Sequence, residues 1–148
     1  MALCSSSAPP ESELVILVVN PHKDDLLSLR GILPSNWILY IAGDAVEAKQ
    51  ILGHTSVPVI LCESELPDGN WKDLLVAVAG IQSPPLLIVT SRLADEFLWA
   101  EVLNLGGYDV LAKPFNSNEF IQVVSTAWRR WKDEWKSGSG ESAMAQSA

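Results

Sequence analysis

The stretch "VPVILCESELPDGNW" (residues 57–71) contains the pattern on which the fold prediction depends. It begins with a short, almost wholly apolar run, which is typical of a strand covered on both faces of a parallel sheet. The run stops at a carboxylate, Glu63, and the chain then enters "PDG", an ordinary turn signature. An ionisable residue at the end of a buried strand is a candidate for a functional site.

Similar apolar runs occur before and after this one, separated by segments with helical spacing. Strands are predicted at 14–19, 37–42, 57–62, 85–90 and 108–112, and helices at about 22–33, 44–53, 70–80, 93–105 and 116–135. Five strands that alternate with five helices predict a parallel, doubly wound α/β sandwich of flavodoxin-like type, with helices on both faces of the sheet.

The composition limits the class of protein. The chain has 148 residues, of which 48% are hydrophobic, and this predicts one globular domain at 13–135. A disordered arm is expected at 1–12 and a flexible tail or linker at 136–148. From the first residues we expect no signal peptide, and no apolar run is long enough to span a bilayer. With only Cys4 and Cys62 and a net charge of -8, we expect a cytoplasmic protein without disulfides that binds neither membranes nor nucleic acid directly.

Polar residues follow the predicted strands. Because the carboxyl ends of parallel strands meet at one edge of a sheet, these residues are expected to lie together. They are Asn20, Pro21 and His22 after the first strand, Glu63, Ser64 and Glu65 after the third, Thr90 and Ser91 after the fourth, and Lys113 and Pro114 after the fifth. A carboxylate, a hydroxyl and an ammonium group are thus predicted to converge. No glycine-rich phosphate loop is present.

With "ILVVN", "LPDG", "IVTSR" and "GGYDVLAKPF", residues 13–132 resemble the response-regulator receiver domain (CheY-like) of two-component phosphorelay systems. The resemblance implies a CheY-like five-stranded fold. It also implies an Asp after strand three that takes a phosphoryl group from a histidine kinase. That Asp and an acidic pair after strand one hold Mg²⁺ in the family, while a Thr or Ser and a Lys contact the phosphoryl oxygens.

The residues of this chain match only part of that pattern. The phosphoacceptor position falls on Glu63, the hydroxyl on Thr90 and the lysine on Lys113, which the family joins to Pro114 by a cis peptide bond. The chain departs from the family at three further positions: Asn20 and Pro21, which replace the acidic metal pair, and Val110, at the position of the aromatic switch residue. Glu65 falls at the loop position whose backbone carbonyl helps to bind the metal in the family.

The charges lead to a hypothesis about this degenerate site. Without the acidic pair, Glu63 and Lys113 balance one to one, so no Mg²⁺ cofactor is expected. Glu63 is about 1.5 Å longer than Asp, and it is predicted to accept bonds from Lys113 and Thr90 as a built-in substitute for phosphorylation. Two alternatives stay open: an inert ion pair, or residual phosphotransfer at another acceptor. The candidate acceptors are Asp24 and Asp25, in the first turn of a helix, and Asp68, in the "PDG" turn.

We therefore predict a non-enzymatic, receiver-like signalling domain that acts through protein–protein interaction. The expected surface is formed by helix four, strand five and helix five, with Phe97 and Leu98 serving the core. Its expected aromatic anchors are Trp99, Tyr108, Trp131 and Trp135. The partner is a kinase, an output domain or another target, or a second copy of the chain through the same surface. The alternatives are a conventional Mg²⁺-dependent phosphorylated receiver and a flavodoxin-like small-molecule binder.

Overall fold

The structure is a computed structural model that describes residues 14–147, with side chains described for residues 14–134. Its five long strands form one parallel sheet in the order β2-β1-β3-β6-β7. These strands are β1 (Val15–Val19), β2 (Ile38–Ala42), β3 (Val59–Glu63), β6 (Leu86–Ser91) and β7 (Asp109–Ala112). The helices are α1 (Lys23–Ile32), α2 (Ala45–His54), α3 (Trp71–Ala79), α4 (Glu96–Leu105) and α5 (Ser117–Ser147). The predicted doubly wound α/β fold is confirmed.

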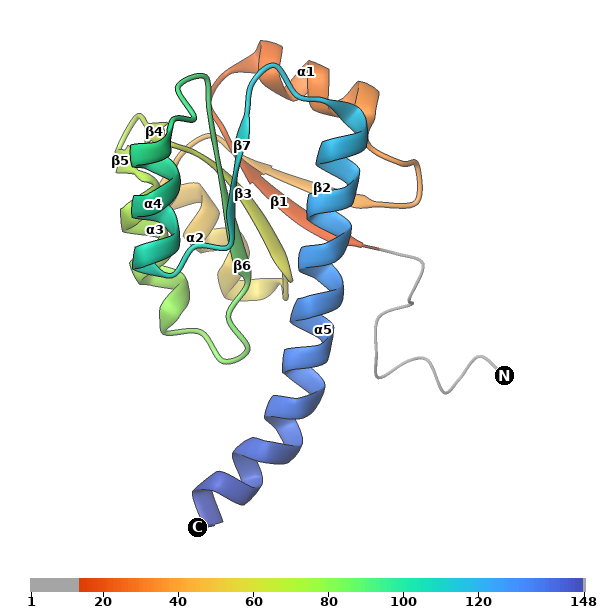
Figure 1. Ribbon diagram of the computed structural model, residues 1–148, viewed down its shortest axis with the longest axis vertical. Helices are drawn as coiled ribbons and strands as arrows, with labels where there is room; N and C mark the ends of the chain where they lie inside the picture. The colour runs from red at the N-terminus through yellow and green to blue at the C-terminus, as the bar shows by residue number, and fades with distance from the viewer. Residues whose placement is uncertain (1–13, 148) are drawn as a thin grey trace.

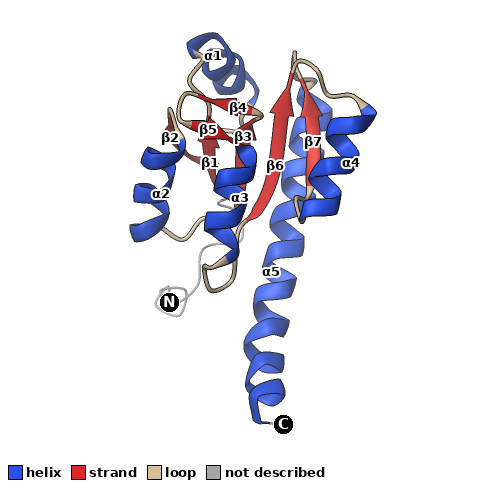
Figure 2. Ribbon diagram, turned by 90° about the vertical axis from the view of Figure 1, so that its left-hand side faces the viewer, coloured by secondary structure: helices blue, strands red, loops and turns tan. Residues whose placement is uncertain are grey.

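The helices cover both faces of the sheet (Figure 1). Helices α2, α3 and α4 lie on one face, which is the near face in Figure 2, and α1 and α5 lie on the other. Successive residues of a strand point to opposite faces, so Leu17 of β1 packs in the core under α2–α4 and Val18 packs in the core under α1 and α5. This arrangement buries β1, β3 and β6 on both faces and brings the carboxyl ends of the strands to one edge.

The end of α5 differs from the prediction. The helix begins where its sequence indicates, because Asn116 Oδ1 accepts a hydrogen bond from the backbone N–H of Glu119 at 2.9 Å. It was expected to stop near residue 135, yet the helical backbone continues through the Gly/Ser-rich segment to Ser147. The boundary of the domain at 135 therefore stays a prediction. Residues 14–147 include no helix with both the length and the hydrophobicity needed to cross a bilayer.

Trp131 was predicted to lie on a partner surface, and this prediction is wrong. Its side chain is buried in its own chain, and its Nε1–H donates to the backbone carbonyl of Ser83 at 3.3 Å. The sequence pattern showed that this turn of α5 lies beyond the sheet. It did not show that the loop between α3 and β6 would cover it. Trp135 lies outside the residues whose side chains the structure describes.

Candidate functional site

The polar residues that follow the strands do converge. Glu63 is the last residue of β3 and pairs in register with Thr90 of β6. Lys113 follows β7 directly and precedes Pro114 through a cis peptide bond, as the resemblance implied. The side chains of Glu63, Thr90 and Lys113 are all at least nine-tenths buried. A carboxylate, a hydroxyl and an ammonium group therefore share one buried position at the edge of the sheet.

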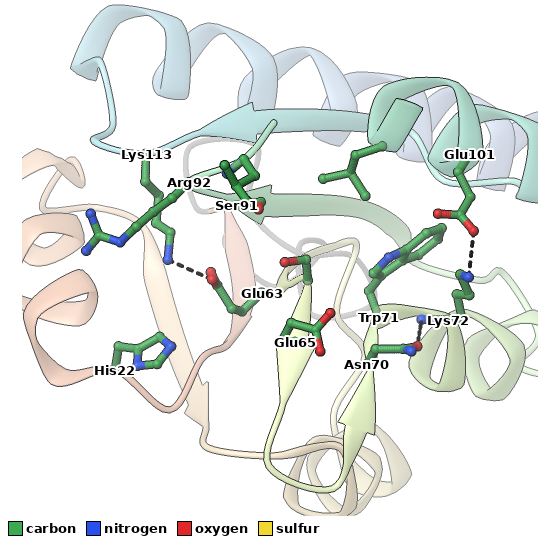
Figure 3. A pocket seen from close by; sticks show the side chains of 13 residues that line it. His22, Glu63, Glu65, Asn70, Trp71, Lys72, Ser91, Arg92, Glu101 and Lys113 are labelled. Carbon is green, nitrogen blue, oxygen red and sulfur yellow. Dashed lines mark hydrogen bonds and ion pairs between the residues drawn. The ribbon is translucent and has the colours of Figure 1, made fainter. Parts of the chain in front are cut away.

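Glu63 accepts both of the hydrogen bonds predicted for it. The Thr90 hydroxyl donates to Glu63 Oε1 at 2.9 Å, and Lys113 Nζ donates to Glu63 Oε2 at 2.7 Å. Figure 3 shows the Lys113 and Glu63 side chains pointing toward one another. Each carboxylate oxygen of Glu63 thus has its own donor, which compensates for the cost of burying the charge.

A second carboxylate, from Asp25 of α1, completes the site. Asp25 is only 6% exposed, and its Oδ2 accepts from Lys113 Nζ at 2.6 Å and from Asn20 Nδ2 at 3.1 Å. The sequence placed Asp25 in the first turn of a helix, which is correct, and interpreted it as an acid that favours the helix dipole or as an alternative phosphoacceptor, not as a partner of Lys113. In the structure, Lys113 Nζ bridges Asp25 and Glu63.

This bridge corrects the predicted charge balance. Glu63 and Lys113 were expected to balance one to one, but the buried group contains two carboxylates and one ammonium group. Arg92 Nη2 approaches Asp25 Oδ1 only to 3.9 Å, and its side chain is 70% exposed, so it screens the excess charge weakly. Burial by itself raises the pKa of Asp25, but the hydrogen bonds from Lys113 and Asn20, together with the positive charge of Lys113, lower that pKa below its ordinary value.

Helical periodicity contains the signal that identifies Asp25. Asp25 and Leu29 are four residues apart and are the two buried residues of α1. They therefore lie on the same face of the helix, which is the face packed on the sheet. An acid in phase with an apolar stripe, one turn before the first buried leucine, is a candidate for a buried carboxylate. Asp24, one position earlier, is exposed.

The loop after β3 is held by a different acid. Asp68 accepts from the backbone N–H groups of Ala45 and Val46, at 3.0 and 3.1 Å, and so binds the first turn of α2. The hydrogen bond from Ala45 is the main cause that lowers the pKa of Asp68. Between Glu63 and α3 the chain forms the short antiparallel pair β4 (Glu65–Leu66) and β5 (Gly69–Asn70). Gly69 has φ +152° and lies where an added Cβ would meet the side chain of Asp73.

An open cleft of about 490 Å³ lies in front of Glu63 and Lys113 (Figure 3). Glu65 and His22 line it with exposed side chains, and neither side chain forms a hydrogen bond or ion pair with Glu63, Asp25 or Lys113. Pro21 follows the end of β1 without a polar side chain. Among the side chains of residues 14–134, no three His, Cys, Asp or Glu residues form a cluster suited to a metal ion.

The expected partner surface is only partly as predicted. Trp99 is 51% exposed and Tyr108 is half-buried. Leu98 packs on the core, as predicted, but Phe97 does not, because it is 86% exposed. Helix α4 is thus more apolar on its outer surface than the sequence pattern indicated.

No family model matches the chain. Curated relatives match at low identity. The chain is 27% identical over 122 residues to the transcriptional regulatory protein CpxR of Escherichia coli K12, covering 80% of this chain and 52% of CpxR. It is 25% identical over 113 residues to the hydrogenase transcriptional regulatory protein HoxA of Bradyrhizobium diazoefficiens, covering 76% of this chain and 23% of HoxA. The chain thus spans between about a quarter and a half of the length of these relatives.

The chain is also similar to a solved receiver domain. The signal receiver domain of an HD domain-containing protein from Pseudomonas fluorescens Pf-5 superposes with a TM-score of 0.78 at 26% identity. The match covers 87% of this chain and 96% of that domain. The strand order, the polar edge of the sheet and these similarities lead to one conclusion: the chain forms a response-regulator receiver (CheY-like) domain of the two-component signalling type.

Proposed function

We propose that this receiver domain signals without phosphorylation and without Mg²⁺, as a non-enzymatic module that binds a partner protein. The observation that carries the proposal is the position of Lys113 Nζ, which lies between two buried carboxylates at 2.6 Å from Asp25 and 2.7 Å from Glu63. The ammonium group of Lys113 thus occupies the position between the carboxylates of Asp25 and Glu63.

The contacts of Glu63 support a built-in substitute for the phosphoryl group. In the receiver family, a hydroxyl after strand four and a lysine after strand five bind the phosphoryl oxygens. Here the corresponding Thr90 and Lys113 both donate to the Glu63 carboxylate. Because Glu63 is longer than Asp, its charge reaches further from the strand and satisfies both donors at once. We infer that Glu63 holds the loops after β6 and β7 in the arrangement that phosphorylation produces in other receivers.

The chemistry of the site is a poor fit for Mg²⁺. This ion requires near-octahedral oxygen ligands at about 2.0–2.1 Å. An ammonium group lies between the two carboxylates, and Asn20 already uses its Oδ1 to accept from the backbone N–H of His22 at 2.8 Å. Its Nδ2, which faces Asp25, is a donor and not a ligand. Binding Mg²⁺ would first require Lys113 to leave both of its partners.

The first experiment compares the native chain with a restored variant under Mg²⁺ and beryllofluoride, a stable phosphoryl analogue. The variant carries Asn20→Asp, Pro21→Asp, Glu63→Asp and Asp25→Asn, which rebuilds the family's acids and removes the one supplied by α1. We expect the variant, but not the native chain, to rise in melting temperature by several degrees. A comparable rise in the native chain would refute the proposal and favour a conventional phosphorylated receiver.

A second experiment separates the phosphoryl substitute from an inert ion pair. Glu63→Gln keeps the size of the side chain and an acceptor for Thr90 but removes the charge that Lys113 binds. If Glu63 holds the signalling surface, amide NMR shifts should change through α4 and β7, including Trp99 and Val110. Asp68→Asn, which perturbs a different strand-end loop, is the control and should leave α4 unchanged. Shifts limited to the neighbours of Glu63 would favour the inert pair.

A further inference from the structure

Helix α4 is unusually apolar for a helix on the surface. Of the ten large hydrophobic side chains that are strongly exposed in the described part of the chain, five lie between residues 93 and 105. They are Leu93, Phe97, Trp99, Leu103 and Leu105. An exposed cluster of this kind is typical of an interaction surface. Trp99 and Leu103 are four residues apart, so they lie on the same side of α4, where Trp99 faces Val110 and Ala112 across a groove.

A groove of about 270 Å³ lies along this flank, between α4, β7 and the start of α5. Trp99 lines it together with Val110 and Ala112, which are too small to fill it. The other residues that line it are Ala94 and three acids, Asp95, Glu96 and Glu119. No Lys, Arg or His lines the groove. It therefore combines an aromatic wall, an apolar floor and a negative rim.

Two of these acids are available to a ligand. Asp95 is already engaged, because its Oδ1 accepts from the backbone N–H of Leu98 at the start of α4. Glu96 and Glu119, by contrast, form no ion pair with any described residue, and both are exposed. Between residues 93 and 105 the chain has three acids and no basic residue; Glu101 is paired with Lys72, so the unpaired negative charge lies at the rim of the groove.

We propose that this groove binds an arginine or lysine side chain from an apolar, basic segment of a partner protein. The cation stacks on the face of Trp99 while Glu96 and Glu119 accept its N–H groups, and neighbouring apolar side chains of the segment pack on Leu103. Positive charge on the partner complements the negative rim, and this gives the docking its specificity. The inference rests on the proposed function only in that the domain acts by binding another protein.

The test uses fluorescence anisotropy with a short labelled peptide of leucine, alanine and two arginines, beside the same peptide with citrulline in place of arginine. Citrulline keeps the shape and removes the charge. We expect the native chain to bind the arginine peptide about tenfold more tightly, since two rim carboxylates contribute together about 1.4 kcal/mol. The double variant Glu96→Gln/Glu119→Gln should lose that preference, and Trp99→Leu should weaken binding about threefold.

A matched variant controls for net charge. Asp24→Asn/Asp133→Asn removes two exposed acids on other surfaces and changes the net charge by the same amount. It should keep the native affinity within about twofold, because exposed charges beyond a Debye length of about 10 Å are screened. Equal weakening by both double variants would mean attraction by net charge alone and would overturn the proposal, as would the absence of binding at millimolar peptide.

Sedimentation of the native chain distinguishes a third outcome. If the chain forms dimers that Glu96→Gln/Glu119→Gln dissociates, the groove is occupied by a second copy and the proposal of a basic partner is wrong. The Mg²⁺ and beryllofluoride titration is independent of all these results. A native response to beryllofluoride would refute the proposed function alone, and failure of the peptide to bind would refute this inference alone.

Discussion

Removing the charge of Lys113 is the most informative single change to this protein. Lys113→Met keeps most of the length of the side chain and its apolar stem but removes the ammonium group. Asp25 and Glu63 then face one another with no cation between them in a buried position, where their side chains are 8% and 9% exposed. Two uncompensated carboxylates in a medium of low dielectric constant repel one another, and each loses its strongest hydrogen bond.

The expected cost follows from the burial of the group. Removing one partner of a buried ion pair typically costs about 3–5 kcal/mol, because the remaining charge stays buried without compensation. Lys113 pairs with two carboxylates, which increases the cost in stability. Proton uptake by the buried carboxylate pair recovers part of this cost. We therefore expect the free energy of unfolding to fall by about 3–5 kcal/mol at pH 7, a large fraction of the 5–15 kcal/mol of an ordinary domain.

Urea unfolding followed by tryptophan fluorescence measures this change. In the variant, Asp25 loses the Lys113 hydrogen bond and charge that lower its pKa but keeps the burial that raises it, so this pKa should rise above its unfolded value. The variant should then gain stability relative to the native chain as the pH falls toward about 4. The difference in the free energy of unfolding between the variant and the native chain should therefore become smaller in acid. The control is Lys72→Met, which breaks the pair with Glu101, where both side chains are more than 40% exposed; it should cost less than about 1 kcal/mol.

Two results would refute this reasoning. A loss below about 1 kcal/mol at pH 7, similar to that of the Lys72 variant, would show that the bridge contributes no more than an exposed ion pair. A gap that stays constant between pH 7 and pH 4 would show that the loss arises from packing and not from unpaired carboxylates.

Three further changes test other parts of the site. Thr90→Val removes the donor to Glu63 Oε1 and should cost about 1.5–3 kcal/mol in urea unfolding, whereas Thr90→Ser, which keeps the hydroxyl, should cost much less. Asp68→Ala removes the acceptor of the Ala45 and Val46 N–H groups at the start of α2 and should lower the free energy of unfolding. In this variant hydrogen exchange at the Ala45 amide should accelerate, and unchanged exchange would contradict this role of Asp68. The folded pKa of Asp25 is lowered from its ordinary value of 3.8, so its contribution is present above that pH and is lost as the pH falls through the folded value. Stability of the native chain should therefore fall on acidification below about pH 4, and Asp25→Asn should flatten this profile; a profile as steep as that of the native chain would contradict the assignment.

Much of the candidate site was predictable because it depends on the sheet. Glu63, Thr90 and Lys113 each follow a strand, and parallel strands bring such positions to one edge regardless of how the helices pack. Glu63 lies opposite Thr90 because β3 and β6 pair in register, and Lys113 follows the neighbouring strand β7. Both residues can therefore donate hydrogen bonds to Glu63. The outer surface of α4 was predicted less well, because the sequence pattern assigned Phe97 to the core while the structure leaves it 86% exposed.

The sequence by itself determined the parallel, doubly wound sandwich and the polar edge of its sheet, since apolar runs covered on both faces are stable only within a sheet that has helices on either side. Only the tertiary structure brought the carboxylate of Asp25 into contact with Lys113 and buried the side chain of Trp131. Asp25 lies 88 residues from Lys113, and it enters the site only because the packing of α1 turns its apolar face, Asp25 included, toward the sheet. Trp131 is buried only because the loop at Ser83 folds over it. Helical periodicity marks Asp25 as a candidate for burial, but only the packing of α1 and α5 decides which groups Asp25 and Trp131 contact.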